Sequence, residues 1–415
     1  MASELGWKEV SLGEVIELKR GYDLPKGKRI PGHIPIVSSS GVSGFHAEAM
    51  VKGPGVVTGR YGTIGEVFYV NEDYWPLNTT LYVRDFKGND PRFISYFLKT
   101  LDFQTYSDKG AVPGINRNHL HLARVRIPGV STQRSIARIL SSIDSKIDLN
   151  RSINQTLEAM AQALFKSWFV DFDPVKAKIA AIQEGRDPLR AAMSVISGKS
   201  DAELDILSSE QYDQLATTAA LFPDEMEESA LGEIPRGWTA PRVGSVFELI
   251  YGKALKSSDR QEGNVPVYGS GGITGWHNMP LVPHGSIIVG RKGTVGRLYW
   301  EDEPFFPIDT TYYVRPLVAP LTFCYYAMQT LGLEKMNTDA VVPGLNRENV
   351  YRIELVLPNS FTLERFDSEA MALRKAIRAN LEANKLLITL RDALLPKLLS
   401  GELSVKGLAE VTGVA

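Results

Sequence analysis

The residues of this chain that could contact a ligand directly are grouped around a short glycine-rich stretch that occurs twice. Residues 59–65 read Gly-Arg-Tyr-Gly-Thr-Ile-Gly, and residues 290–296 read Gly-Arg-Lys-Gly-Thr-Val-Gly, 231 positions later. Arginine is a frequent reader of guanine, and glycine lets another backbone approach closely. Arg60 and Arg291 are therefore candidates for contacts with phosphates or bases. The alternative is a tight connection between strands that the arginines support by hydrogen bonds.

The sequence carries none of the common motifs that predict catalysis. It lacks a Gly-x-x-x-x-Gly-Lys-Ser/Thr phosphate loop and the Asn/Asp-Pro-Pro-Tyr/Phe stretch of an amino-methyltransferase. Its single cysteine, Cys324, and its six scattered histidines form no metal-binding pattern. Glu17-Leu18-Lys19 matches part of a nuclease motif, but such triplets are frequent by chance. We expect Cys324 to be a buried small apolar residue, because it lies among Phe323, Tyr325 and Tyr326.

The length and composition predict a soluble protein of two or three domains. The chain has 415 residues, of which 44% are hydrophobic and 23% are charged. It contains no apolar run of about 18 residues, and its first ten residues are too polar for a signal peptide. A single cysteine permits no internal disulfide, which fits a reducing compartment. We therefore expect a cytoplasmic protein without membrane contact.

The net charge of −2 hides an uneven distribution. Residues 201–235 hold ten acidic side chains and no lysine or arginine, so the rest of the chain carries +8. This excess is smaller than that of most DNA-binding domains. It suggests that contacts with an anionic partner are few or are shared with other subunits.

The repeat extends far beyond the glycine-rich stretch. Three further pairs of matching segments have nearly the same separation: Gly6-Trp7 with Gly237-Trp238, Gly44-Phe45-His46 with Gly275-Trp276-His277, and residues 112–117 with residues 342–347. A period of about 230 residues is too long for a solenoid, so each copy is expected to be a domain. Short β-branched and aromatic runs predict several strands in each copy, with helices over 91–101 and 321–331.

A hydrophobic period of 3.5 residues follows each predicted domain. It covers 132–169 after the first domain and recurs after the second, which predicts two long helices with coiled-coil seams. Both seams carry two asparagines, Asn150 and Asn154 in one and Asn380 and Asn384 in the other. If the helices pair antiparallel, Asn150 comes close to Asn384 and Asn154 to Asn380, as a polar layer that fixes the register. The alternative is that these asparagines face solvent.

Taken together, these motifs resemble the specificity subunit of a type I restriction–modification system. That family has two target-recognition domains, each with an early Gly-Trp and a Gly-Arg-x-Gly-Thr-x-Gly segment, and each followed by a long helix. The resemblance covers about 5–169 and 235–401. Residues 132–136 (Thr-Gln-Arg-Ser-Ile) stand where the family commonly has Glu-Gln-x-x-Ile, whereas residues 362–366 depart from that pattern.

The resemblance implies an α+β fold with pseudo-twofold symmetry. Its expected segments are recognition domains at 1–130 and 236–358, antiparallel coiled-coil helices at 131–170 and 359–401, an acidic helical linker at 171–235 and a weakly structured tail at 402–415. Within the linker we expect short helices and a mobile acidic part near 223–233. Cap-forming Ser200 and Glu203 indicate the start of one such helix.

The resemblance also implies a non-catalytic role. Such a subunit reads an asymmetric, bipartite site in double-stranded DNA and holds two methyltransferase subunits, and restriction subunits join the larger complex. S-adenosylmethionine, ATP and Mg are expected on those partner subunits, and no cofactor on this chain. Two alternatives stay open: a fused restriction–methylation enzyme whose catalytic part is on a separate chain, and a symmetric protein-interaction scaffold that does not read DNA.

Specificity is expected where the two copies differ, because a shared segment cannot distinguish two half-sites. The predicted DNA contacts lie in and around the polar loops of both domains: Tyr22, Lys26, Lys28, Arg29, Ser38, Ser39, Ser40, His46, Arg60, Tyr61, Lys109, Lys253, Lys256, Arg260, Tyr268, Ser270, His277, Arg291 and Lys292. For Asn116 and Asn346, in a Pro-Gly turn shared by both copies, a capping role is favoured. Trp168 and Phe169 at the end of the first long helix are expected either in the helical core or in a dock for a methyltransferase subunit.

Overall fold

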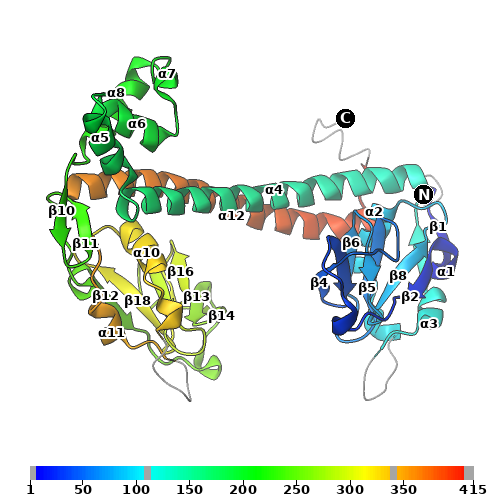
Figure 1. The fold of residues 1–415 in the computed structure, drawn as a ribbon. Helices are drawn as coiled ribbons and strands as arrows, with labels where there is room; N and C mark the ends of the chain where they lie inside the picture. Colours follow the sequence, from blue (N-terminus) through cyan, green and yellow to red (C-terminus); the bar gives the residue numbers. More distant parts are fainter. Residues whose placement is uncertain (1–5, 107–113, 337–343, 406–415) are drawn as a thin grey trace. The chain divides into compact units, whose positions relative to one another are not determined.

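The computed structural model describes residues 6–106, 114–336 and 344–405 (Figure 1). The chain forms two compact units. The first comprises Met1–Ser152 together with Asn380–Ala415, and the second comprises Ile153–Ala379. Each unit contains one copy of the repeat and one segment of each long helix. The division therefore falls inside the helices, and not at the ends of the predicted segments. Among the residues described, no helix is both long enough and apolar enough to cross a membrane.

The first repeat domain is a mixed α/β structure built on three small sheets. Its elements are β1(Lys8–Ser11), α1(Leu12–Val15), β2(Glu17–Arg20), η1(Lys26–Lys28), β3(Ile34–Ser38), β4(Gly41–His46), β5(Gly55–Gly59), β6(Val67–Val70), β7(Trp75–Pro76), β8(Thr80–Asp85), α2(Pro91–Lys99), η2(Phe103–Tyr106), α3(Arg117–His121) and β9(Arg124–Ile127). The strand orders are β2-β8-β5-β6, β4-β3-β7 and β1-β9.

The local sequence explains where these elements lie. Strand β5 reads Gly-Val-Val-Thr-Gly, lies between β8 and β6, and is buried throughout. Helix α2 starts at Pro91, and the Asp90 side chain caps it by accepting a hydrogen bond from the Phe93 amide at 2.8 Å. Phe93 and Phe97 of this helix belong to the core that also contains the inner residues of β2, β5 and β8. The helix ends at Lys99, two residues before the predicted end.

The second repeat domain has the order of elements found from α1 to α3 in the first, and isolated bridges (Thr239 with Leu357, Arg242 with Glu354) stand in place of the β1–β9 pair. Its elements are α9(Val243–Val246), β12(Phe247–Tyr251), η3(Ser257–Asp259), β13(Val265–Gly269), β14(Gly272–His277), β15(Ser286–Gly290), β16(Leu298–Glu301), β17(Phe306–Pro307), β18(Thr311–Pro316), α10(Leu321–Thr330), η4(Leu333–Lys335) and α11(Arg347–Tyr351). The sheets β12-β18-β15-β16 and β14-β13-β17 repeat the strand orders of the first domain. The register repeats as well, since Val57 pairs with Tyr82 and Ile288 pairs with Tyr313.

The long helices are α4(Val130–Phe169) and α12(Ser360–Ser400). In the first unit, Asn150 donates to the Asn384 side chain at 2.9 Å, and Arg391 pairs with Asp144 at 3.0 Å. Residue numbers therefore rise along α4 while they fall along α12, so the two segments run antiparallel. The second unit shows the same direction. Asn154 of α4 donates to the Ile377 carbonyl of α12 at 3.3 Å, and Glu158 of α4 forms an ion pair with Arg374 of α12 at 3.4 Å.

The start of α4 is attached to the first repeat domain by Gln133. Its buried side chain accepts a hydrogen bond from the Asp90 amide at 3.0 Å and donates to the Asn89 side chain at 2.7 Å and to the Pro128 carbonyl at 2.9 Å. These bonds satisfy a polar group that would otherwise be costly to bury. They also fix the direction in which the helix leaves the domain.

The linker between α4 and the second repeat domain contains the short helices that its sequence predicts. They are α5(Asp173–Gln183), α6(Pro188–Ser197), α7(Asp201–Leu204) and α8(Ser209–Ala220). The last three share a small core that includes Met193 and Leu204, whereas Val175 of α5 belongs to the main core of the second unit. Ser200 and Glu203 form the predicted capping box of α7.

The expectation of a mobile acidic part near 223–233 was wrong. Strands β10(Met226–Ser229) and β11(Gly232–Pro235) form an antiparallel hairpin there. Ile234 is buried in the core of the second unit, and Arg236 pairs with Glu225. The glutamates remain exposed, so the apolar face of the hairpin provides packing that the charge count did not reveal.

Candidate functional site

The glycine-rich segment of each repeat is a closed loop at the end of a buried strand. After β5, the Gly59 amide donates to the Glu66 carbonyl at 3.0 Å, and the Gly65 amide donates back to the Gly59 carbonyl at 3.3 Å. Gly62 and Gly65 have φ values of 79° and 82°, which strongly favour glycine. A Cβ at Gly59 would lie 1.8 Å from the Thr63 carbonyl oxygen. The glycines are therefore required by the loop itself.

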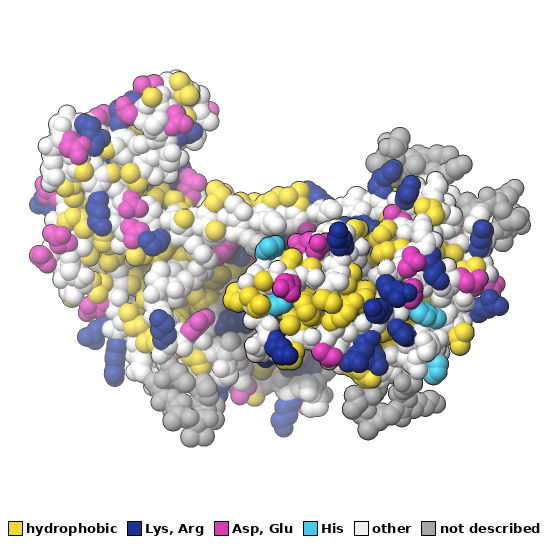
Figure 2. Space-filling view, turned by 45° about the vertical axis from the view of Figure 1, so that its right-hand side comes forward, with side chains coloured by type: hydrophobic (Ala, Val, Ile, Leu, Met, Phe, Trp, Pro, Cys, Tyr) yellow, Lys and Arg dark blue, Asp and Glu magenta, His cyan; other side chains and the backbone are white. Residues whose placement is uncertain are grey.

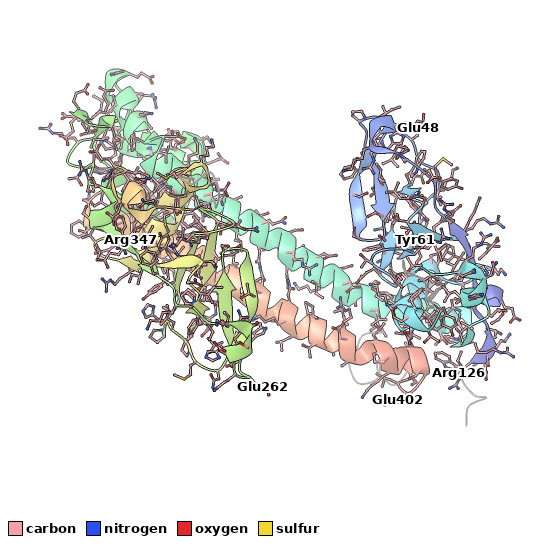
Figure 3. All side chains as sticks on the ribbon, turned by 90° about the horizontal axis from the view of Figure 1, so that it is seen from below. Glu48, Tyr61, Arg126, Glu262, Arg347 and Glu402 are labelled. Carbon is pink, nitrogen blue, oxygen red and sulfur yellow. The ribbon has the colours of Figure 1, made fainter. Side chains whose placement is uncertain are left out.

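This loop is joined to the Ile115-Asn116 turn by backbone bonds. The Ile115 amide donates to the Arg60 carbonyl at 3.1 Å, and Tyr61 forms a bridge with Gly114. The second repeat has the same link, because the Leu345 amide donates to the Arg291 carbonyl at 2.8 Å. The shared motifs around residues 60 and 116 thus form one structural frame (Tyr61 and Arg347 are labelled in Figure 3).

The two turn asparagines are helix caps, as the sequence favours. Asn116 accepts from the Asn118 amide at 3.0 Å at the start of α3, and Asn346 accepts from the Glu348 amide at 2.9 Å at the start of α11. Because the caps begin α3 and α11 at the following residue, Arg117 and Arg347 come next to the glycine-rich loop of their domain.

In the first unit this arrangement produces a basic hollow. It has a volume of about 300 Å³ and is lined by Arg20, Arg60, Leu81, Ile115, Asn116, Arg117 and Asn118. The Arg60 guanidinium lies 4.5 Å from the centre of the Tyr61 ring. Arg20 forms an exposed ion pair with Asp23 at 3.6 Å. Because none of the described residues that line the hollow is a carboxylate, it can accept an anion.

The corresponding residues of the second unit are arranged differently. Tyr251, at the end of β12, stands at the place of Arg20 at the end of β2. The guanidinium groups of Arg291 and Arg347 lie 4.9 and 4.8 Å from the centre of its ring. Arg291 also donates to the Asp309 carbonyl at 2.8 Å.

Several predicted contact residues have exposed side chains. Lys26 and Lys28 of η1, Ser40, and the second-repeat residues Lys253, Lys256 and Lys292 are exposed, and Tyr22, Ser38, Ser39, Arg60, Tyr61, Ser270, His277 and Arg291 are partly exposed. Ser39 lies beside the first glycine-rich loop, and Ser270 accepts a hydrogen bond at 3.5 Å from the Thr294 amide of the second. Lys109 lies outside the described residues. The loops that differ between the repeats therefore adjoin the shared frame.

Two of the predicted contact residues are buried instead. His46 is only 3% exposed, and its ring accepts a hydrogen bond from the Ile30 amide at 2.9 Å. Tyr268 is 7% exposed and donates to Glu301 at 2.8 Å, and burial raises the pKa of its hydroxyl. The prediction of DNA contacts was wrong for both, because tertiary packing uses their polar atoms inside the domain.

Two predicted arginines support the loops in which they lie. Arg29 donates to the Ser43 carbonyl at 3.2 Å, and Arg260 donates to the Thr274 carbonyl at 2.7 Å. Each bond connects the segment before a strand (β3 or β13) to the next strand of the same hairpin (β4 or β14). Both arginine side chains are partly exposed. Tyr22 shares a hydrogen bond of 3.0 Å with the Tyr82 hydroxyl in the same domain.

The asparagines of the long helices are placed differently from one another. Asn150 and Asn384 are 2% and 6% exposed, and in the first unit their side chains bond to each other. Asn154 and Asn380 are partly exposed. The Asn154 side chain bonds to a backbone carbonyl of α12.

For Trp168 and Phe169 the structure supports the core alternative. They are 1% and 4% exposed, and both contact Phe366 of α12. Phe169 also contacts Trp238 of the second repeat domain. Side chains buried in this way cannot form an exposed dock. Cys324 is likewise fully buried, as expected, and burial raises the pKa of its thiol to about 12.

Sequence reasoning missed Arg20, Arg117, Tyr251 and Arg347 as site residues. The signal was present: Asn-Arg recurs in both repeats, and aligning the repeats at the main offset places Arg20 opposite Tyr251. What was lacking was the knowledge that β2, the glycine-rich loop and the turn before α3 meet at one hollow.

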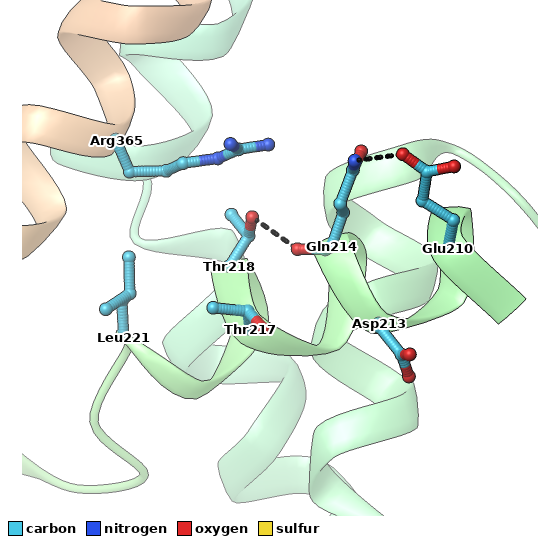
Figure 4. A pocket seen from close by; sticks show the side chains of 7 residues that line it. All are labelled: Glu210, Asp213, Gln214, Thr217, Thr218, Leu221 and Arg365. Atoms are coloured by element: carbon cyan, nitrogen blue, oxygen red, sulfur yellow. Dashed lines mark hydrogen bonds between the residues drawn. The ribbon is translucent and has the colours of Figure 1, made fainter.

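Elsewhere in the second unit, a hollow of about 540 Å³ lies between α8 and Arg365 of α12 (Figure 4). Glu210 and Asp213 make it partly acidic, which is unfavourable for DNA. Among the residues described, no group of three or more His, Cys, Asp and Glu side chains could hold a metal ion. On the face shown in Figure 2, Lys and Arg side chains gather beside an apolar patch on the first unit.

Comparison with known proteins agrees with this architecture. The family model described as "Type I restriction modification DNA specificity domain" matches residues 4–159 and 235–383. The chain is 28% identical to the type I restriction enzyme HindI specificity subunit of Haemophilus influenzae, over 96% of this chain and 99% of that protein. It is 21% identical to the MjaIX specificity subunit of Methanocaldococcus jannaschii, over 80% and 74%.

A solved structure has a similar fold. The S subunit of the type I restriction–modification system from M. genitalium matches with a TM-score of 0.58 and 19% sequence identity, over 96% of this chain and 97% of that one.

Proposed function

Since the chain belongs to the type I restriction–modification DNA specificity family, we propose that it is the subunit that selects the DNA sequence for its complex. Each repeat domain reads one half of an asymmetric, bipartite site. The observation that carries this proposal is the duplicated domain, in which a shared frame supports loops of different sequence. One chain then presents two similar but unequal readers to one duplex.

The division between frame and loops supports this assignment of roles. The glycine-rich loop and the capped turn recur in both domains and are joined by the same backbone bonds. Elements common to both readers suit contacts that position a domain on the DNA backbone. Exposed, non-matching residues such as Lys28 and Lys256 suit contacts that differ between the half-sites.

We further propose that α4 and α12 form an antiparallel coiled coil, arranged with pseudo-twofold symmetry, that sets the spacing of the half-sites. The Asn150–Asn384 bond and the antiparallel pairing in each unit support it. A buried asparagine pair fixes the register of such helices, because any shift leaves the amides without partners.

The same helices are proposed to dock two methyltransferase subunits. In the first unit, Leu149 of α4 and Leu381, Leu386 and Leu390 of α12 are 48–73% exposed. Exposed apolar residues along a helix suit a partner helix. In the proposal, the methyltransferase subunits bind S-adenosylmethionine, restriction subunits use ATP and Mg, and this chain performs no chemical step.

Co-expression of the chain with its genomic neighbours tests the function directly. Sequencing of methylated adenines in the host DNA is expected to give a split, asymmetric motif. Methylation without sequence preference would contradict the proposal and would favour a protein-interaction scaffold.

Domain exchange sharpens the same test. Replacing residues 5–130 by the matching segment of a relative should change one half of the motif and leave the other half unchanged. Replacing residues 236–358 serves as the reciprocal control and should change only the other half. A change of both halves in either exchange would contradict independent reading.

A further inference from the structure

We propose that the basic hollow of the first unit binds a phosphate of the DNA backbone, and that the second repeat domain lacks an equivalent site. This inference rests on the proposed function and extends it. It assigns the two readers unequal shares of the electrostatic contact with the duplex.

The hollow is built from four segments that are separated in sequence: the end of β2, the loop after β5, β8 and the turn before α3. Arg20 ends β2 and pairs with Leu81 of β8, and β8 pairs in turn with β5, whose end leads to Arg60. The hydrogen bond from the Ile115 amide to the Arg60 carbonyl holds the turn that carries Arg117 beside the glycine-rich loop. Three arginines therefore line one hollow, which neighbouring strands and the adjoining turn form together.

The chemistry of this lining favours phosphate. Guanidinium groups present paired N–H donors that match phosphate oxygens, and their charge is permanent at physiological pH. Among the residues that the structure describes, no carboxylate belongs to this lining. Asp23, which pairs with Arg20, is 69% exposed, so a phosphate can displace it at little cost.

The shared residues argue for contact with the backbone and against contact with a base. Arg60 and Arg117 have counterparts in Arg291 and Arg347, and a residue common to both readers cannot distinguish the half-sites. Asn116 already uses its side-chain oxygen to cap α3. Phosphate binding would therefore position the first domain without selecting sequence.

In the second unit, two residues differ in charge from the residues that line the hollow at the matching positions of the first unit. Tyr251 stands for Arg20, and Glu348 stands for Asn118, so the formal charge of the matching side chains falls from +3 to +1. Both remaining arginines lie within 5 Å of the Tyr251 ring, and Arg347 pairs with Glu348 at 3.4 Å. Arg60 of the first domain also has a cation–π contact, with Tyr61, so the difference between the two domains is the loss of positive charge at the matching positions.

The test measures how the affinity of the complex for duplex DNA depends on salt. The full chain, with its methyltransferase subunits, is titrated by fluorescence anisotropy against a duplex that carries its methylation motif, over a range of KCl concentrations. Loss of one phosphate contact reduces the slope of log K against log salt by about 1. Arg20→Gln should show this reduction and should weaken binding to a motif-free duplex by the same factor.

Arg84→Gln is the matched control. The Arg84 side chain is 53% exposed, as that of Arg20 is, and it also pairs with one carboxylate, that of Glu17. Both substitutions remove one positive charge from the same sheet, but Arg84 is not among the residues that line the hollow. Its variant should keep the wild-type slope.

Three results would overturn the proposal: an Arg20→Gln slope equal to that of the wild type, an equal reduction in the Arg84→Gln control, or a loss of affinity confined to the motif. In each case the motif methylated by the wild-type complex can be unchanged, so the proposed function stands. Absence of any specific motif in the wild type is the separate failure of that function.

Two further arms complete the experiment. Tyr251→Arg combined with Glu348→Asn rebuilds the first-domain residues in the second domain and should steepen the slope by about 1; an unchanged slope counts against the proposal. Replacing KCl by potassium phosphate at equal ionic strength should weaken wild-type binding more than Arg20→Gln binding, because free phosphate competes with the DNA phosphate for the intact hollow. Equal weakening of both proteins would count against the proposal.

Discussion

At the scale of single residues, the two repeats use different side chains to accept a hydrogen bond from the same backbone amide. In the first domain the Leu18 amide donates to His121 Nε2 at 3.0 Å, and in the second the Leu249 amide donates to the Tyr351 hydroxyl at 2.7 Å. The histidine can accept this bond only while Nε2 carries no proton. Burial, together with Arg117 and Lys87, lowers the pKa of His121.

This difference predicts a pH dependence that belongs to the first domain. Because the pKa of His121 is lower in the folded state, the unfolded chain takes up the proton first as the pH falls. The contribution of His121 to the free energy of unfolding should therefore be largest above the ordinary histidine pKa of about 6.5 and should decrease below it. In His121→Tyr this decrease should be smaller.

Urea unfolding of the wild type and of His121→Tyr at pH 8 and pH 5.5 measures this effect. Tyr351→Phe is the control in the second domain, and it should leave the pH dependence unchanged. Identical pH dependence of the wild type and His121→Tyr would show that His121 does not contribute.

A second prediction at this scale concerns Trp168. Because its side chain is buried against Phe222 and Phe366, Trp168→Ala should lower the free energy of unfolding by about 3–5 kcal/mol. Denaturant unfolding gives this value, and co-purification reports binding of the methyltransferase. A variant with wild-type stability that no longer binds the methyltransferase would contradict the core assignment and revive the docking role.

At the scale of elements, the long helices of the first unit combine apolar packing with a buried polar pair. Leu140 and Ile147 of α4 and Leu398 of α12 are buried. The buried side chains of Asn150 and Asn384 form a hydrogen bond with each other. Asn384 also donates to the Ile147 carbonyl at 3.4 Å. The asparagines make the pairing selective, since a shifted register would bury amides without partners.

A double-mutant cycle tests the asparagine pair. Asn150→Leu and Asn384→Leu, each made alone, leave a buried polar group of the other asparagine unpaired and should each destabilise the chain by about 1–3 kcal/mol. Asn150→Leu combined with Asn384→Leu removes both polar groups and should recover most of that loss. Thermal and denaturant unfolding of the wild type, the two single variants and the double variant give the four stabilities that the cycle compares. Strictly additive effects would mean that the two side chains are not coupled.

At the scale of the whole molecule, charge limits what the chain can do alone. The net charge is −2, and the acidic linker offsets the basic excess of the remaining residues. We predict that the isolated chain binds duplex DNA weakly and with a steep salt dependence, and that methyltransferase subunits raise the affinity. The anisotropy titration, repeated without partners, measures this. Tight binding of the isolated chain at physiological salt would refute it.

The sequence alone was sufficient for the features that depend on local or periodic patterns. The duplication, the long helices, the caps at Asn116 and Asn346 and the short linker helices all follow from residue types at fixed spacings. These patterns are informative because helix formation and capping are decided within a few residues of the chain.

Only the tertiary structure decided which polar side chains are available to a partner. His46 and Tyr268 look like surface residues in sequence but satisfy bonds inside their domains. Conversely, Arg20 and Arg117 are unremarkable until β2 and the turn before α3 meet at one hollow. The physical reason is that exposure depends on contacts between distant segments, and no local pattern records them.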